Sequence, residues 1–431
     1  MHQGNFDLSL EQITKIEGHA ALTLKVKNGT VEKCTFEVPE YKRFYTQAVR
    51  GKHITAIPQM VARICGTCSN AHLLCSIRAV EDAMGIKVSK QTYLLRRILN
   101  NGLIIRDHAL HLYVFVLPDL YGRESLLAFD EAIEEEHELV HDAFAIKEVG
   151  NLLAKWSGGR SVHAPFPTIG GFLTLPKNGD QEKLILKLEL IRKKVEKIIK
   201  IFEKCEFEIK EDILFSALQD NNYDFFGKTI ITADNACVPA RNYADHLELV
   251  VKPYSQASAY MYEGKTFMVG ALSRMNLSKA GLHAHTKHGA ESALKLFPSQ
   301  NIFHNNLAQA IEILHCLDDS IDILSKLEIK DEKPVPYTLK AGMGTGVIEA
   351  PRGTLYHRYQ IDEKGVVIHG DIIVPTGQNQ ICIEKSLWDF AQKNLHLEKK
   401  QLAHEMEKLI RAYDPCMSCS SHFLKLKIEQ L

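Results

Sequence analysis

The chain has 431 residues, a formal net charge of −1 and 45% hydrophobic residues. This composition is typical of a globular protein with a large apolar core, and the balanced charge gives no sign of a basic surface for nucleic acid. No apolar run reaches the roughly 18 residues that a membrane-spanning helix needs. The first residues, Met1–Asp7, lack the pattern of a signal peptide.

The first predicted element is a β-hairpin over residues 20–38. Apolar and polar residues alternate on both sides of Asn28-Gly29, and Asn-Gly between two such runs is a strong hairpin signal. Glu17 lies just before the hairpin, and its simplest interpretation in isolation is a surface carboxylate at the entrance of a strand.

Two cysteine pairs lie at opposite ends of the chain. Cys65 and Cys68 form one Cys-x-x-Cys, and Cys416 and Cys419 form the other. Each pair can hold one side of a metal ion, and two pairs complete a four-thiolate site. A self-contained zinc ribbon has its second pair within roughly 15–20 residues, so this site would instead join the two ends of the chain.

A helix is predicted directly after the first pair. Apolar residues recur with helical spacing over 73–84, and Gly85 ends the run. Cys68 is therefore expected at a helix N-terminus, where the helix dipole favours anionic sulfur. His72 follows one turn later, and we interpret it as support for a thiolate rather than as a core histidine.

A long apolar helix is predicted over 89–120. It contains Asp107, which is costly to bury unless it is paired. Asp107 is either half of a structural pair with an arginine or a residue with a functional role. Further helices are predicted over 133–156, 180–210, 304–327, 384–394 and 399–412.

The rest of the chain is mixed or strand-rich. Short strands are predicted near 228–232, 247–251 and 266–270, and again over 345–375, where Glu363-Lys364-Gly365 closes a hairpin. His283, His285 and His288 are interpreted as loop residues rather than metal ligands. The stretches around Pro351-Arg352 and Pro375-Thr376 are either ordinary turns or parts of one pocket, in which arginine could bind an anionic group.

The fold class predicted from these elements is α+β, mainly α. We expect one domain over 1–431 with a long central helical bundle and small peripheral antiparallel sheets. Its expected segments are the hairpin 20–38, a helical body 68–215, a mixed region 220–300, strands 345–375, the metal motif 414–422 and a tail 423–431. The six cysteines outside the pairs lack a disulfide framework and are expected to be buried free thiols in a reducing compartment.

Two motifs resemble the signatures of the nickel–iron hydrogenase large subunit. They are R-x-C-G-x-C-x-x-x-H from Arg63 to His72, and D-P-C-x-x-C-x-x-H from Asp414 to His422. The resemblance extends over nearly the whole chain. It implies reversible heterolytic cleavage of dihydrogen, with electrons passed to an iron–sulfur small subunit and further electron-transfer subunits, because this chain has no spare cysteine cluster. Local stretches over 349–357 and 376–379 are most similar to the cytoplasmic, cofactor- or ferredoxin-coupled branch.

The resemblance also implies a set of metal ligands. Cys65 and Cys416 would be terminal ligands of nickel, and Cys68 and Cys419 would bridge nickel to an iron that carries carbon monoxide and cyanide. The residues around the iron ligands would be two hydrogen-bond donors and two prolines that shape an apolar slot. These residues are Arg352, Thr376, Pro351 and Pro375.

The same resemblance assigns roles to charged residues. Glu17 would relay protons from Cys416, and Lys15 stands where the family usually has an arginine. Asp107, Arg352 and Asp414 would form a charged canopy over the metals.

Two further expectations concern a magnesium ion and the tail. The family's magnesium is held by a glutamate, a backbone carbonyl (Ile372 here) and the last motif's histidine (His422). Thr46 aligns with that glutamate and is a neutral, weak ligand for a hard cation; Glu40 could substitute if the alignment slips. The resemblance also implies maturation proteins and a protease that removes residues 423–431.

Two alternatives remain open at this point. A non-catalytic module of a respiratory-type complex shares the fold but lacks the four cysteines. A structural zinc protein would use the same four thiolates in a closed tetrahedral site, and would give no reason for Glu17, Asp107 and Arg352 to match.

Overall fold

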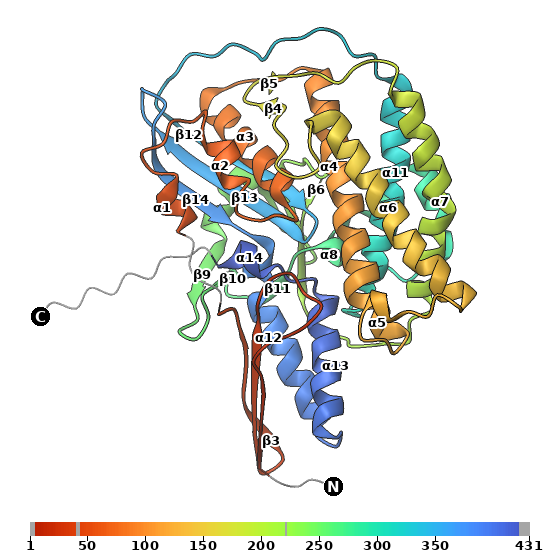
Figure 1. The fold of residues 1–431 in the computed structure, drawn as a ribbon. Coiled ribbons are helices and arrows are strands. Elements are labelled where there is room, and N and C mark those ends of the chain that lie inside the picture. Colours follow the sequence, from red (N-terminus) through yellow and green to blue (C-terminus); the bar gives the residue numbers. More distant parts are fainter. Residues whose placement is uncertain (1–4, 40–43, 220–221, 422–431) are drawn as a thin grey trace, which may run out of the picture.

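The computed structural model describes residues 5–39, 44–219 and 222–421. Four long helices lie side by side and form the body of the molecule (Figure 1). They are α4 (Lys90–Leu110), α6 (Glu134–Gly158), α7 (Gln181–Glu203) and α11 (His304–Lys326). The predicted central helical bundle is therefore confirmed.

Local sequence explains where these helices begin and how closely they pack. The Ser89 hydroxyl caps α4 by accepting a hydrogen bond from the Thr92 backbone N–H at 3.0 Å. Helices α4 and α6 approach so closely at Gly102 that a Cβ there would lie 2.8 Å from the Gly150 carbonyl oxygen. Glycine is required at this crossing, which sets the position of α4 and of the charged residues one turn further on.

A three-stranded antiparallel sheet lies against α3 (Ser69–Met84), as Figure 1 shows. Its strands are β12 (Gly342–Ala350), β13 (Gly353–Ile361) and β14 (Val367–Ile373). A Cβ at Gly346 would lie 2.0 Å from the Cys75 carbonyl oxygen, so glycine permits this close contact. The tight turn between β12 and β13 consists of Pro351 and Arg352, and the packing fixes this turn relative to the start of α3.

The other sheets are small. One contains β1 (Phe6–Leu10), β2 (Ala21–Lys27) and β3 (Thr30–Glu37). A four-stranded sheet has the order β11 (Phe267–Met268), β6 (Leu214–Gln219), β7 (Thr229–Thr232), β8 (Cys237–Pro239), in which β11 and β6 are parallel. Two pairs complete the set: β4 (Pro167–Thr168) with β5 (Gly171–Phe172), and β9 (Leu247–Val251) with β10 (Ser258–Tyr262).

The remaining helices are mostly short. They are α1 (Tyr45–Ala48), α2 (Ile57–Val61), a π-helix (His111–Val116), α5 (Leu117–Leu120), α8 (Ala271–Ser278), α9 (Ala284–Gly289), α10 (Glu291–Leu294), α12 (Pro375–Lys393), α13 (Lys399–Ala412) and α14 (Met417–Ser420), with 3-10 turns at Leu126–Ala128, Ala240–Asp245 and Lys279–Gly281. Within the described ranges, no helix is long and apolar enough to cross a membrane.

The structure corrects several predicted boundaries. The helix predicted over 89–120 contains a π-helical stretch, the helix predicted over 180–210 ends at Glu203, and the helix predicted over 384–394 begins at Pro375. Proline fits the first turn of a helix because the backbone N–H that it lacks has no partner there. The hairpin predicted over 20–38 is part of a three-stranded sheet, whose additional strand, β1, was not predicted from the sequence. Two of the three histidines interpreted as loop residues, His285 and His288, lie on α9.

Candidate metal centre

Four buried cysteine sulfurs meet where the two ends of the chain come together. The Sγ atom of Cys416 lies 3.5 Å from that of Cys65 and 3.1 Å from that of Cys419, and the sulfurs of Cys68 and Cys419 are 3.1 Å apart. All four sulfurs lie within 4.8 Å of one another. The structure therefore brings the two sequence-predicted pairs into one four-sulfur cluster, with the donor chemistry that suits soft metals.

The starts of two helices and one arginine hold the two pairs in place. Cys68 is the residue before α3, and Cys416 is the residue before α14. Arg106 of α4 donates hydrogen bonds to the backbone oxygens of Thr67 and Ser161. A buried guanidinium is thus attached directly to the Cys65–Cys68 loop, and it supplies positive charge beside the thiols.

The pKa values of the buried thiols are strongly shifted, and the charge of several thiolates here would need a cation beside it. Hydrogen bonds from Cys416 hold the pKa of Cys65 well below its ordinary value, whereas burial raises the pKa of Cys416 far above its own. Four buried thiolates cannot coexist without compensating positive charge. Metal ions supply that charge, and the residues present therefore fit a metal centre.

Glu17 is attached to the same cluster by its backbone and its side chain. The Met417 N–H donates to the Glu17 carbonyl at 3.0 Å, the Ser418 N–H donates to its carboxylate at 3.2 Å, and the Glu17 backbone forms an isolated β-bridge with Cys416. Burial, and then the nearby Cys65 sulfur, raise the pKa of Glu17. Glu17 is therefore not the surface carboxylate of the simpler interpretation.

Lys15 and Asp119 help to fix the segment that carries Glu17. Lys15 pairs with Asp119 at 2.5 Å, and Arg411 donates both to Asp119 at 2.6 Å and to the Thr14 carbonyl at 3.0 Å. Lysine at position 15 thus has an acidic partner in this chain.

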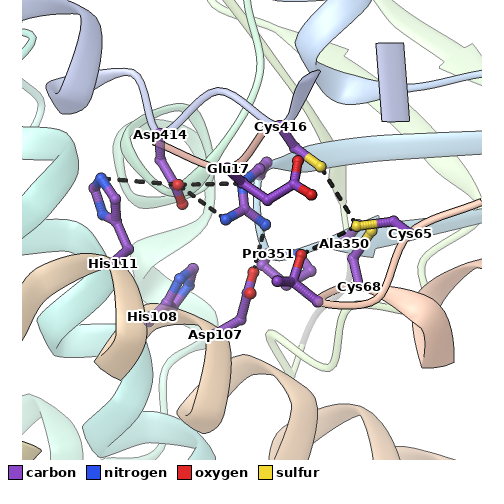
Figure 2. A network of polar contacts seen from close by, with 12 residues as sticks. Glu17, Cys65, Cys68, Asp107, His108, His111, Ala350, Pro351, Asp414 and Cys416 are labelled. Carbon is purple, nitrogen blue, oxygen red and sulfur yellow. Dashed lines mark hydrogen bonds and ion pairs between the residues drawn. The ribbon is translucent and has the colours of Figure 1, made fainter. Parts of the chain in front are cut away.

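Arg352 is paired with two aspartates, Asp107 and Asp414. Figure 2 shows these aspartates on the same side of the cysteine sulfurs. The Nη1 atom of Arg352 lies 2.6 Å from the Asp107 carboxylate, and Nε lies 3.1 Å from the Asp414 carboxylate. Burial lowers the pKa of Arg352, but the two aspartates outweigh burial and hold the pKa well above its ordinary value. Asp107 is therefore paired with arginine, as expected for a carboxylate buried in an apolar helix, and the pair lies at the cluster.

A small cavity adjoins the cluster on the side of these charged residues. Its lining includes three cysteines of the cluster together with His72, Ala350, Pro351, Arg352, Leu355, Pro375 and Thr376, and it leaves about 10 Å³ of space for a water-sized molecule. The Thr376 hydroxyl accepts a hydrogen bond from the Cys416 N–H at 2.8 Å and keeps its own hydrogen for another acceptor. The Nη2 atom of Arg352 is ion-paired with the Asp414 carboxylate at 3.0 Å but makes no hydrogen bond of good geometry within the described residues. The guanidinium and the Thr376 hydroxyl can therefore still donate to small ligands of a metal.

His72 contacts the cluster from the first turn of α3. Its Nε2 atom lies 3.7 Å from the Cys419 sulfur, and its Nδ1 atom lies 3.0 Å from His357 Nε2. His357 in turn lies 2.6 Å from the Tyr359 hydroxyl. This placement agrees with the expectation that His72 supports a thiolate.

The sequence did not reveal the buried pair network behind the Pro351-Arg352 turn. Arg274 of α8 pairs with Glu312 through two contacts of 2.7 Å and with Glu349 at 2.7 Å, and it donates to the carbonyls of Ala350 and Pro351 at 3.1 and 3.0 Å. Glu312 also binds His108 and Tyr223. A lone glutamate in the apolar run of residues 311–317 was the available signal, because a buried carboxylate requires partners.

Two more residues that sequence analysis missed hold Asp414. The Gln309 amide donates to Asp414 at 2.9 Å, and His111, at the start of the π-helix, lies 2.6 Å from the Gln309 side-chain oxygen and 3.8 Å from Asp414. π-Helical turns are often found at functional sites. Here the turn begins at the residue that faces the aspartate (Figure 2).

The structure leaves the expected magnesium ligands only partly defined. Helix α1, which carries Thr46, packs against β14, which carries Ile372. His422 and Glu40 lie outside the described residues, as does the tail 423–431.

The comparisons with known proteins agree with this arrangement. The family described as "Nickel-dependent hydrogenase" matches residues 43–132 and 119–422. The chain is 32% identical over 427 residues to the sulfhydrogenase 1 subunit alpha of Pyrococcus furiosus, covering 97% of this chain and 98% of that one. It is also 32% identical over 422 residues to the sulfhydrogenase 2 subunit alpha of the same organism, covering 97% and 100%.

A solved structure supports the fold independently. The crystal structure of an NAD+-reducing [NiFe]-hydrogenase in the H2-reduced state superposes with a TM-score of 0.88 at 21% identity, covering 97% of this chain and 99% of that chain. The two cysteine pairs, their convergence and these matches together identify the family. The chain belongs to the nickel-dependent hydrogenases, as a nickel–iron hydrogenase large subunit, an oxidoreductase that acts on dihydrogen.

Proposed function

We propose that Cys65 and Cys416 are terminal ligands of nickel, and that Cys68 and Cys419 bridge nickel to an iron carrying carbon monoxide and cyanide. When bound, these metals supply a soft electrophilic site at which dihydrogen is polarised and split. The observation that carries this proposal is the convergence of four buried sulfurs beside a cavity that Arg352 and Thr376 line.

Glu17 is the proposed proton carrier. Its backbone forms a bridge with Cys416 and the Cys416 side chain influences its pKa, so the carboxylate is placed to take a proton from that sulfur. A carboxyl whose pKa is raised by burial takes and releases a proton more readily near neutral pH than an ordinary one. Hydrogen bonds from the Met417 and Ser418 N–H groups hold Glu17 beside Cys416.

Arg352 and Thr376 are the proposed donors to cyanide nitrogen. The Nη2 atom of Arg352 and the Thr376 hydroxyl both line the cavity, and Pro351 and Pro375 make its apolar walls. Asp107 and Asp414 hold the Arg352 guanidinium in a fixed orientation, so its N–H groups need not reorient when a ligand binds. His72 adjusts the basicity of the Cys419 thiolate through its contact with that sulfur.

An iron–sulfur small subunit and further electron-transfer subunits are the proposed partners. All ten cysteines lie in the described part of the chain, and within it the four at the centre form the only group of three or more cysteines that could hold a metal ion. Electrons therefore need an acceptor outside this chain. We also propose a cytoplasmic location, maturation proteins that load the metals, and removal of residues 423–431 once the metals are loaded.

Infrared spectroscopy of the purified, active complex tests the proposed iron ligands. Iron-bound carbon monoxide and cyanide give bands in a region where protein does not absorb. We expect one carbon monoxide band and cyanide bands that shift in Thr376→Val, because that variant removes a donor and keeps the shape of the side chain. Active enzyme without such bands would overturn the assignment.

A further inference from the structure

A second group of metal-ligating side chains lies on the outer surface, at the N-terminal end of α6. Residues 137–141 read His-Glu-Leu-Val-His, which places His137 and His141 four positions apart on one helix. Side chains at this spacing share a helix face. The pattern H-E-x-x-H on a helix is the arrangement by which two histidines bind zinc in many enzymes.

The turn before the helix supplies a third ligand. Glu131 Oε2 lies 2.6 Å from His137 Nδ1 and 3.9 Å from His141 Nε2, and the two imidazole rings are 4.3 Å apart. Two ligands of a tetrahedral zinc ion, each about 2.1 Å from it, lie roughly 3.4 Å apart. The observed separations lie on either side of that value, so small side-chain rotations are enough to enclose an ion.

The charges around the three side chains are mixed. Glu134 and Glu135 lie exposed in the first turn of α6, whereas Glu136 is buried and paired with Arg123. Three lysines of α7 line the same groove as the two histidines. Lys194 pairs with Asp142, Lys197 pairs with both Asp142 and Glu138, and Lys193 has no ion pair within the described residues.

The pairing of Glu138 decides what kind of site this is. In hydrolytic enzymes with this motif the middle glutamate is a free general base, whereas Glu138 lies 2.8 Å from the Lys197 ammonium. The three ligands are also substantially exposed, with side chains 49% (His137), 61% (His141) and 59% (Glu131) accessible. The site is therefore suited to binding a metal at the surface and not to peptide hydrolysis.

We propose that Glu131, His137 and His141 form a surface site for a divalent transition-metal ion, with zinc the best-suited, and with water in the remaining position. Two imidazoles and one carboxylate are a common zinc ligand set, and they exclude the hard cations that prefer oxygen alone. This site is separate from the four-sulfur centre and shares no residue with it.

Zinc titration of the metal-loaded complex tests the proposal. Competition with a chromophoric chelator should reveal one zinc site that weakens by about 10-fold or more in His137→Ala and in His141→Ala, since even loss of an outer partner costs about 10–100-fold. Glu131→Gln should weaken zinc binding as well. Glu138→Gln removes the same charge as Glu131→Gln, from a nearby residue that is not a proposed ligand, and should leave the affinity nearly unchanged.

Zinc-edge X-ray absorption identifies the ligands directly. The expected spectrum contains two imidazoles and oxygen, without sulfur, and it should be lost in the double variant His137→Ala, His141→Ala while hydrogen oxidation is kept. His288→Ala, a change at an exposed histidine elsewhere, should alter neither result. Unchanged zinc binding in the double variant, zinc bound by sulfur, or a larger loss in Glu138→Gln than in His137→Ala would each overturn the assignment.

Discussion

Replacing Arg274 by methionine tests whether a buried charge network positions the Pro351-Arg352 turn. The Arg274 side chain is 3% exposed and neutralises Glu312 and Glu349, which are 0% and 1% exposed. It also binds the carbonyls of Ala350 and Pro351. Methionine fills much of the same volume but leaves two buried carboxylates without their cation.

The expected loss of stability can be worked from Glu312. Burial raises the pKa of Glu312, but the Arg274 charge and hydrogen bonds outweigh it, and the pKa falls from its ordinary 4.5 to about 2. That fall corresponds to about 3 kcal/mol of folding free energy at neutral pH. Because the folded pKa is depressed, this stabilisation is present above pH 4.5 and is lost as the pH falls toward 2.

We therefore expect Arg274→Met to lower the free energy of unfolding by about 3–5 kcal/mol, the usual cost of breaking a buried pair. Urea unfolding at pH 7 measures this loss, with Lys295→Met as the exposed control, where a loss below about 1 kcal/mol is expected. The cyanide infrared bands should shift in the loaded variant, because the turn that carries Arg352 relaxes. Unfolding at the wild-type urea concentration together with unshifted bands would refute the positioning role.

Other predictions concern the centre itself. Glu17→Gln should keep nickel and lose most turnover, because an amide cannot carry a proton; hydrogen oxidation and proton–deuterium exchange at wild-type rates would exclude Glu17 as the carrier. Cys68→Ala should abolish activity and lower nickel content, whereas Cys75→Ala, at a buried thiol bonded only to backbone oxygens, should retain nickel. Intact mass of active, nickel-loaded protein should correspond to a chain ending at His422, and an active chain ending at Leu431 would contradict processing.

The sequence predicted the ligands of the centre better than their supports. The two Cys-x-x-Cys motifs have fixed spacing, so they identify four candidate sulfur ligands from local sequence alone, without knowledge of the tertiary structure. Asp107 was found because a charged residue in an apolar helix needs a partner. The same reasoning applies to Glu312 in the apolar helix α11, but its partners, Arg274 and Tyr223, come from other segments and no local pattern connects them.

The predicted boundaries of helices and strands were wrong where tertiary packing or backbone geometry determines where an element begins or ends. Of the two alternatives for Pro375, the ordinary turn is wrong, because proline is favoured in the first turn of a helix and α12 begins there. The π-helical turn at His111 leaves the apolar pattern of 89–120 nearly intact, so periodicity could not detect it. Strand β1 alternates apolar and polar residues strictly, but it is only 5 residues long and is held by pairing with β2.

Nickel-edge X-ray absorption of the purified complex tests the central claim most directly. If the four converging sulfurs of Cys65, Cys68, Cys416 and Cys419 hold nickel, the spectrum should show about one nickel per chain bound by several thiolate sulfurs, as soft ligands favour. Nickel–sulfur scattering should be lost in Cys416→Ala. Active protein without nickel, or with zinc bound by these sulfurs in its place, would contradict the account.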